Sequence, residues 1–184
     1  MNLLTAINSM LPYVGQRTVS TVTSNHPSVA TAKGMLEDKR RELLNKAWWF
    51  NQRTVTLYPD VSNRIAKPID TVAVYPISAD LIEARGGFLF NLTQNTDQFT
   101  APLQCTLRDD LAFDDLPATA QEVITWNAAV NMYLAKFEGG AVPTRLDRDS
   151  IYAQAALEAE HLRKQNYNSH NLPAVQRITR ILRG

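Results

Sequence analysis

The chain has 184 residues, 45% of them hydrophobic, and its 19 basic and 18 acidic side chains give a formal charge of +1. This length suits one domain, or one domain with an insertion, that buries its own core. The near-neutral balance excludes the bulk basic excess typical of proteins that bind DNA as their main task, because phosphate contacts supply most of that affinity.

Residues 3–14 are predicted to form a short helix, because apolar residues recur at helical spacing and Pro12 and Gly15 are expected to end it. The same segment lacks a basic region before its apolar residues and a small-residue cleavage site, so we expect no signal peptide. No apolar run approaches the ~20 residues that cross a bilayer, so we expect no membrane insertion.

A second helix is predicted over residues 27–50. Pro27 suits its first turn, where the missing N–H costs nothing. Arg40 falls inside the apolar stripe, so its aliphatic stem is expected along the edge of the core. Charged residues cover the opposite face, as in an amphipathic helix with one side to bury. The apolar positions are Val29, Ala32, Leu36, Leu43, Ala47 and Phe50.

Residues 53–108 change to the alternating pattern of strands. Pro59 and Asp60 indicate a turn after the first strand. Gly86 and Gly87 stand between two short apolar runs, which is a hairpin signal. We therefore expect a small antiparallel sheet with long loops, and the loops at 62–68 and 91–100 are expected to be mobile or organised by neighbouring subunits.

Helices return after Pro117. A helix over residues 117–137 is expected to end at Gly139 and Gly140, and a further helix is expected to begin at Asp147 or Asp149. The apolar face of the first comprises Val123, Trp126, Val130, Tyr133, Leu134 and Phe137. In the second, the residues expected to face inward are Ile151, Ala155 and Leu162.

These elements predict an α+β fold within a single domain, residues 1–184. Two helix pairs, at about 3–50 and 117–168, form a bundle, and a small antiparallel β-sheet, at about 53–108, is inserted between them. The expected division of the chain is 1–52 and 109–170 for the bundle, 53–108 for the β-rich insertion and 171–184 for a C-terminal docking tail.

Three consecutive aromatic residues, Trp48, Trp49 and Phe50, stand where the helical pattern gives way to strands. A surface that stacks nucleobases, a membrane wedge and a structural corner are the three interpretations. Because no membrane-spanning segment is expected, the interpretation of the triplet as a membrane wedge has little support. We expect the rings to fill the seam between bundle and sheet, because burial removes ~150–250 Å² of each from water.

Motifs for chemistry are absent from the sequence. It has no P-loop, no strand-linked G-x-G-x-x-G and no G-x-S-x-G. The single cysteine, Cys105, lies in an alternating run and is interpreted as a small buried strand residue. The histidines lack metal-site spacing, and no cofactor is expected. A carboxylate pair could come from four residues that also favour a helix N-terminus: Asp109, Asp110, Asp114 and Asp115.

The last residues carry arginines every third position among apolar residues. Too short to fold alone, this segment is expected to gain order by packing on its own bundle or, as we prefer, on a partner. The residues expected to bind that partner are Arg177, Ile178, Arg180, Ile181, Leu182 and Arg183.

Several motifs in their present spacing resemble one family. They are KAWWFN, TLYPD and ARGGFLFN, which contain Trp48, Trp49, Phe50, Pro59, Asp60, Arg85, Gly86 and Gly87, with Phe99 downstream. The chain is similar to the tail tubular protein A family, the head-to-tail adaptor proteins of short-tailed bacteriophages. The resemblance runs from about residue 3 to Phe137, and the last forty or so residues match in character alone.

The resemblance implies a structural virion protein without enzymatic activity. Family members form a dodecameric ring between the portal and a tail nozzle of the tail tubular protein B type, and the genome passes through the channel in transient contact with the protein. The expected location is the short tail at the portal vertex, after assembly in the host cytoplasm. The expected partner of the C-terminal tail is the portal.

Two other functions stay open on the sequence. One is a DNA-binding module that uses the tail arginines, which predicts tight and steeply salt-dependent binding. The other, less favoured, is a tail-associated cell-wall hydrolase, which requires a cleft with paired carboxylates.

Overall fold

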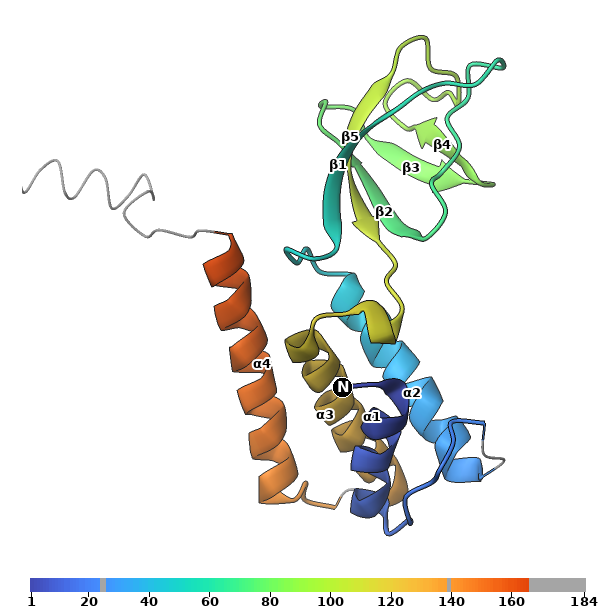
Figure 1. Cartoon of the computed structure of the whole chain (residues 1–184). Coiled ribbons are helices and arrows are strands. Elements are labelled where there is room, and N and C mark those ends of the chain that lie inside the picture. Colours follow the sequence, from blue (N-terminus) through green and yellow to red (C-terminus); the bar gives the residue numbers. More distant parts are fainter. Residues whose placement is uncertain (24–25, 139, 166–184) are drawn as a thin grey trace, which may run out of the picture.

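Four α-helices pack together at one end of the molecule, and two small antiparallel sheets stand at the other (Figure 1). The computed structural model describes residues 1–23, 26–138 and 140–165. The α+β fold class predicted from the sequence is confirmed. The helical elements are α1 (Leu3–Met10), η1 (Leu11–Val14), α2 (Pro27–Leu44), η2 (Phe113–Asp115), α3 (Ala118–Lys136) and α4 (Thr144–Lys164). The strands are β1 (Gln52–Leu57), β2 (Thr71–Pro76), β3 (Ile82–Arg85), β4 (Phe88–Asn91) and β5 (Leu103–Asp109).

The N-terminal helix forms as predicted, although Pro12 does not end it. The Asn2 side chain caps α1 by accepting a hydrogen bond from the Thr5 N–H at 2.8 Å. Pro12 lies inside η1, whose tighter turn continues α1. Gly15 ends the element in the left-handed conformation, at φ 68°.

The second helix ends earlier than predicted, at Leu44 instead of residue 50. The reason is the fully buried side chain of Asn51. Its Nδ2 donates to the carbonyls of Leu44 and Lys46, both at 3.1 Å, and its Oδ1 accepts from the Trp48 N–H at 2.9 Å. One amide group thus takes the place of the helical hydrogen bonds and folds residues 45–51 into a turn.

The third helix buries a different face from the predicted one, because it is the central helix of the bundle. It contacts α1, α2 and α4, and small residues let these helices approach closely. Its buried apolar residues are Ala120, Val123, Ile124, Ala128, Ala129 and Met132. Of the predicted face, Val123 is buried, Trp126, Val130 and Tyr133 are half-buried, and Leu134 and Phe137 are exposed.

The fourth helix also corrects a prediction. It begins at Thr144, after Pro143, so neither Asp147 nor Asp149 is its cap. Its buried residues are Leu146, Ala153 and Leu157. The residues predicted to face inward, Ile151, Ala155 and Leu162, are exposed instead. The helix carries two apolar stripes, and spacing alone does not say which one meets the bundle.

The strands form two sheets instead of the single one expected. One sheet has the order β1-β5-β2, and β3 and β4 form a separate hairpin. Gly86 and Gly87 make its turn at φ 56° and 85°, which confirms the hairpin predicted there. Cys105 pairs with Val55 in the larger sheet and is fully buried, as predicted, and burial raises the pKa of its thiol.

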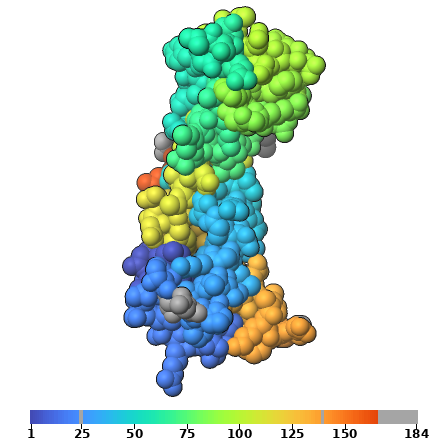
Figure 2. All heavy atoms as spheres, turned by 90° about the vertical axis from the view of Figure 1, so that its right-hand side faces the viewer, coloured from blue at the N-terminus to red at the C-terminus, as the bar shows by residue number. Residues whose placement is uncertain are grey.

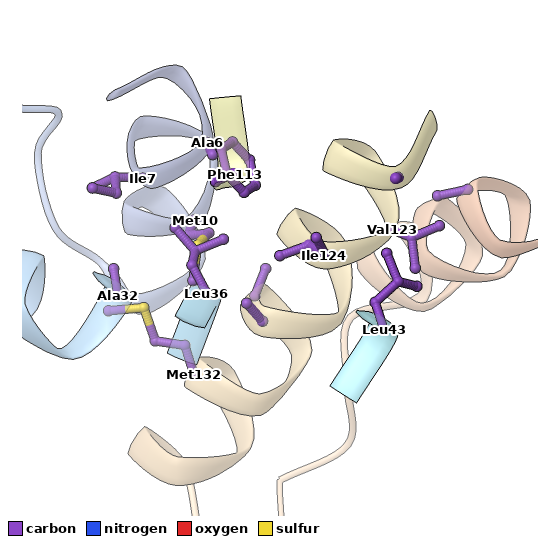
Figure 3. Close-up of a cluster of buried hydrophobic side chains, with 14 of the residues drawn as sticks. Ala6, Ile7, Met10, Ala32, Leu36, Leu43, Phe113, Val123, Ile124 and Met132 are labelled. Atoms are coloured by element: carbon purple, nitrogen blue, oxygen red, sulfur yellow. The ribbon is translucent and has the colours of Figure 1, made fainter. Parts of the chain in front are cut away.

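The buried apolar side chains of the described residues form two clusters. Figure 3 shows part of the larger one, where Ile7 and Met10 of α1 lie among Leu36 of α2 and Ile124 and Met132 of α3. The smaller cluster lies among the strands and comprises Ile65, Leu89, Phe99 and Leu103. The division of the chain into bundle and β-rich insertion follows these clusters and stays a prediction. Among the described residues, no helix is both long and apolar enough to cross a membrane.

Candidate functional site

The aromatic triplet lies at the junction between the helices and the larger sheet. Trp48 is 5% exposed, and its Nε1 donates to the Leu43 carbonyl at 2.9 Å. Phe50 stacks nearly parallel to Trp48, with ring centroids 6.3 Å apart, and meets Trp49 edge-on at 4.9 Å. The rings therefore cover one another and leave little open face for a nucleobase. This geometry favours the predicted seam role over a stacking surface.

A histidine from a distant part of the chain completes this junction. The His161 ring of α4 lies 5.2 Å from Trp48 and 5.9 Å from Trp49, between ring centroids. Its Nδ1 is buried and has no hydrogen-bond partner among the described residues. This contact ties the C-terminal half of α4 to the turn after α2. Sequence reasoning missed it, because nothing local marks His161.

A buried arginine makes the second link between the helices and the segment that returns from the sheet. Arg40 donates to Glu37 through Nε at 2.7 Å and Nη2 at 2.8 Å. Its Nη1 donates to Asp110 and to the Leu111 carbonyl. Arg40 is 9% exposed, which agrees with the position of its stem predicted along the edge of the core. It joins α2 to the connection between β5 and η2.

This network makes the free energy of unfolding depend on pH in the acid range. The hydrogen bond from Arg40 holds the pKa of Glu37 below its ordinary value. A carboxylate with a lowered folded-state pKa stabilises the fold above its unfolded-state pKa, and that contribution is lost as the pH falls through the folded-state value. We expect Arg40→Met to lose less stability than the wild type between pH 6 and pH 3, measured by urea unfolding. Equal losses would contradict this assignment.

The four acidic residues considered for catalysis do not converge. Asp109 pairs with Arg53 at 2.9 Å, Asp110 pairs with Arg40, and Asp114 accepts a hydrogen bond from the Leu3 N–H at 2.9 Å. Asp115 is exposed in η2. No group of acidic, histidine or cysteine residues in the described part of the chain could hold a metal ion.

A groove of about 500 Å³ runs beside this network. Its lining mixes apolar side chains with Lys33 and three charged residues that are engaged in ion pairs, and no serine, cysteine or histidine belongs to it. The lining residues are Leu3, Lys33, Leu36, Glu37, Arg40, Asp110, Ala112 and Phe113. The arrangement holds two parts of the chain together, and the groove offers no hydroxyl, thiol or imidazole nucleophile.

The TLYPD motif organises a loop of the β part, away from the triplet. Asp60 Oδ1 accepts hydrogen bonds from the N–H groups of Ser62 and Arg64, at 2.8 and 2.9 Å. Pro59 precedes it, half-buried. The Arg64 guanidinium then lies 3.8 Å from the centre of the Phe88 ring. The motif thus builds a loop that packs on β4.

The Arg85-Gly86-Gly87 turn lies beside this loop. Lys67 N–H donates to the Gly87 carbonyl at 2.9 Å, and the Leu89 N–H donates to the Ile65 carbonyl at 2.8 Å. Arg85 covers the Phe90 ring at 4.5 Å. The loop at 62–68 is therefore held by the chain itself. The two β motifs lie together, and the structure does not bring them to the triplet.

Exposed large apolar side chains gather on both parts of the molecule. In the β part they are Tyr58, Val61, Ile69, Tyr75, Ile77, Leu81 and Leu92. On α3 and its C-terminal end, and on α4, they are Leu134, Phe137, Ile151, Tyr152 and Leu162. Exposed apolar side chains mark surfaces that meet other proteins where they form contiguous patches. The predicted tail residues Arg177, Ile178, Arg180, Ile181, Leu182 and Arg183 lie outside the described residues.

Comparisons with known proteins agree with the motifs. A family model described as "Tail tubular protein" matches residues 4–167. Over 192 residues, the chain is 31% identical to a protein of Klebsiella phage KP34 described as "Tail tubular protein A". The match covers 98% of this chain and 97% of that relative, so it includes the helices and the sheets.

Proposed function

The chain belongs to the tail tubular protein family and is a structural component of the phage tail, and from this premise we propose that it is the head-to-tail adaptor. In this role, copies of the chain form a dodecameric ring at the portal vertex of the virion. The ring joins the portal to the tail nozzle, and DNA passes through it during ejection.

The observation that carries this proposal is the placement of exposed apolar side chains on two distant parts of an elongated chain. Figure 2 shows the sheets at one end and the helices at the other. An adaptor contacts one partner at each end and identical copies at its sides, so apolar surface is required on both parts. A monomeric enzyme has no such need.

The balance of charge suits the same role. With a formal charge of +1, many copies can pack in one ring with little mutual repulsion. DNA that slides through a channel also requires weak phosphate contacts, because strong neutralisation of phosphates would hold it in place. The basic excess expected of a dedicated DNA-binding module is missing.

The ring proposal is tested by native mass measurement of the purified chain, alone and mixed with the portal protein. We expect a complex that contains twelve copies of this chain on one portal. A portal that binds one or two copies, or none, would contradict the adaptor role. Steeply salt-dependent DNA binding without portal binding would favour the DNA-binding module instead.

We further propose that residues 172–184 bind the portal. Deleting them is expected to weaken binding to the portal at least ten-fold, because three arginines and their apolar neighbours are removed at once. Biolayer interferometry measures this loss. The matched control changes Arg177, Arg180 and Arg183 to lysine, which keeps the charge. If the deletion leaves the affinity for the portal unchanged, residues 172–184 do not bind the portal.

A further inference from the structure

We propose that neighbouring copies in the ring contact each other through two unlike helix faces. The outer face of α4 in one copy packs on the outer face of α2 in the next. This inference rests on the proposed ring and names the surfaces that close it. The α4 face comprises Ile151, Tyr152, Ala155, Ala159 and Leu162, and the α2 face comprises Ala30, Thr31, Gly34 and Asp38.

Helix α4 carries apolar residues on two opposite sides. Its inner side packs on α3 through Leu146, Ala153 and Leu157. On the outer side, Ile151 is 58% exposed and Tyr152 is 64% exposed. A helix at the surface of a bundle is normally polar on its outer face, and one with apolar residues all round is normally buried. The outer α4 face therefore requires a cover from outside the described fold.

Helix α2 has a glycine near its middle. Gly34 lies on the exposed side of an 18-residue helix, without a positive φ. A Cβ built there would have no atom within 4 Å, so packing within the chain does not require glycine. Glycine at such a position destabilises a helix relative to alanine. Close approach of another backbone or a bulky side chain gives a physical reason for it.

The two faces match in the size of their side chains. Projecting Ile151 and Tyr152 side chains fit a surface of small residues, where helices approach closely.

Their positions also suit a ring. In Figure 1, α4 stands at the left edge of the helical part, and α2 lies on the right. Figure 2, which views the side opposite α4, shows α2 at the surface in blue to light blue. A ring closes through heterologous contacts, in which each copy offers one patch to the neighbour on its left and another to the neighbour on its right. An isologous pair through α4 alone would stop at a dimer.

The proposed contact between α4 and α2 buries a small area, so its test must detect weak association. Stable interfaces bury about 800 Å² on each partner, and one helix packed on another buries less. We therefore expect isolated subunits to associate weakly, and the portal to gather them. A covalent trap at high concentration detects such a contact, whereas a dilute equilibrium measurement misses it.

The trap uses two single substitutions, Gly34→Cys and Ala155→Cys, in separately tagged full-length chains. The native Cys105 is fully buried, so wild-type chains give the background. When the two variants are mixed and treated with a short bis-maleimide, we expect a covalent dimer that contains one copy of each variant. Each variant alone should give no dimer. A dimer of Ala155→Cys with itself, or no mixed dimer, would overturn the inference.

The mixed cross-link should depend on the apolar side chain. Adding Ile151→Asp to the Ala155→Cys chain is expected to lower the yield at least ten-fold. Ile69→Asp is the matched control, because Ile69 is an exposed isoleucine of the β part, and it should leave the yield unchanged. Equal loss from both changes would overturn the assignment of the α4 face.

Gly34→Lys distinguishes an effect on the contact between copies from an effect on folding. It is expected to raise the stability of the subunit and to prevent ring formation. Lysine is a better helix former than glycine, so we expect the melting temperature of the free subunit to rise by about 2 °C. Ring formation on the portal should be lost, because the long side chain blocks the approach of α4. A variant that is more stable and still forms rings would contradict the inference.

Two other occupants of the α4 face have distinct outcomes. If the C-terminal segment of the same chain covered it, deleting residues 166–184 would speed maleimide labelling of Ala155→Cys in dilute protein, and that result would overturn the inference. Rings on the portal without a mixed cross-link would leave the adaptor role intact and reject these faces. Absence of rings on the portal would reject the adaptor role, and the inference with it.

Discussion

Replacing Trp48 with alanine is expected to lower the free energy of unfolding by about 3–5 kcal/mol. The indole is 5% exposed, stacks on Phe50, meets His161 and donates to the Leu43 carbonyl. Its removal leaves a cavity at the junction and takes one hydrogen bond from the Leu43 carbonyl, which still accepts from the Lys46 N–H at 3.0 Å. Urea unfolding followed by far-ultraviolet circular dichroism measures the loss without relying on tryptophan fluorescence.

The neighbouring Trp49 provides the matched control. Trp49 is half-buried, so Trp49→Ala is expected to cost less than Trp48→Ala. If the two substitutions cost the same, or if Trp48→Ala costs under about 1 kcal/mol, the junction does not depend on Trp48. A nucleobase-stacking surface predicts a different result, in which Trp49→Ala impairs DNA binding and leaves stability unchanged.

The second large effect is expected at Asn51. Asn51→Ala removes hydrogen bonds to three backbone groups, of Leu44, Lys46 and Trp48, and is expected to cost about 3 kcal/mol. Asn51→Asp is expected to cost more at neutral pH, because a carboxylate cannot donate to the two carbonyls and its charge is buried. Urea unfolding at pH 7 measures both losses.

The pH dependence distinguishes these two variants. In Asn51→Asp, burial raises the pKa of the introduced carboxyl group above its unfolded-state value, because the charged form loses water. A raised folded-state pKa gives stability that is present at low pH and is lost as the pH rises. Asn51→Asp should therefore recover part of its stability between pH 7 and pH 4, whereas Asn51→Ala should not. Parallel pH curves would contradict the role given to the Asn51 amide.

Local signals predicted much of the fold. The two glycines at 86 and 87 specified a hairpin, because only residues tolerant of positive φ suit its turn. Arg40 interrupted an apolar stripe, and its buried position at the edge of the core followed from that. Both signals depend only on residues close by in the sequence, so one sequence is enough to recognise them.

Features set by distant contacts were not predictable in the same way. The end of α2 depends on the side chain of Asn51, seven residues beyond the last helical residue. His161 reaches the aromatic triplet across more than a hundred residues. The motif KAWWFN contained the asparagine, but an asparagine there is equally consistent with an exposed loop.

The error in α4 has a physical cause that bears on function. Both faces of this helix are apolar, so the pattern fits two orientations, and Ile151, Ala155 and Leu162 were assigned to the wrong one. Packing on α3 selects the stripe with Leu146, Ala153 and Leu157. The unused stripe is the one that a neighbouring copy is proposed to cover. Such a helix encodes one face for the fold and one for assembly.

The junction between the helices and the larger sheet and the outer faces of α2 and α4 both serve the proposed connector role. Arg40, Asn51 and Trp48 fix the helices to the segments that enter and leave the larger sheet. A connector that joins two partners requires a defined distance between its ends, and these buried contacts restrict motion where the two parts meet. Variants at the junction should therefore impair assembly through stability, whereas variants of the outer faces should impair assembly alone.

The most direct test of the adaptor role is electron cryo-microscopy of purified particles at the portal vertex. We predict a closed ring of twelve copies of this chain between the portal and the tail nozzle, with α4 of each copy against α2 of the next. Density that placed the chain elsewhere in the particle, or as isolated copies without a closed ring, would contradict the account.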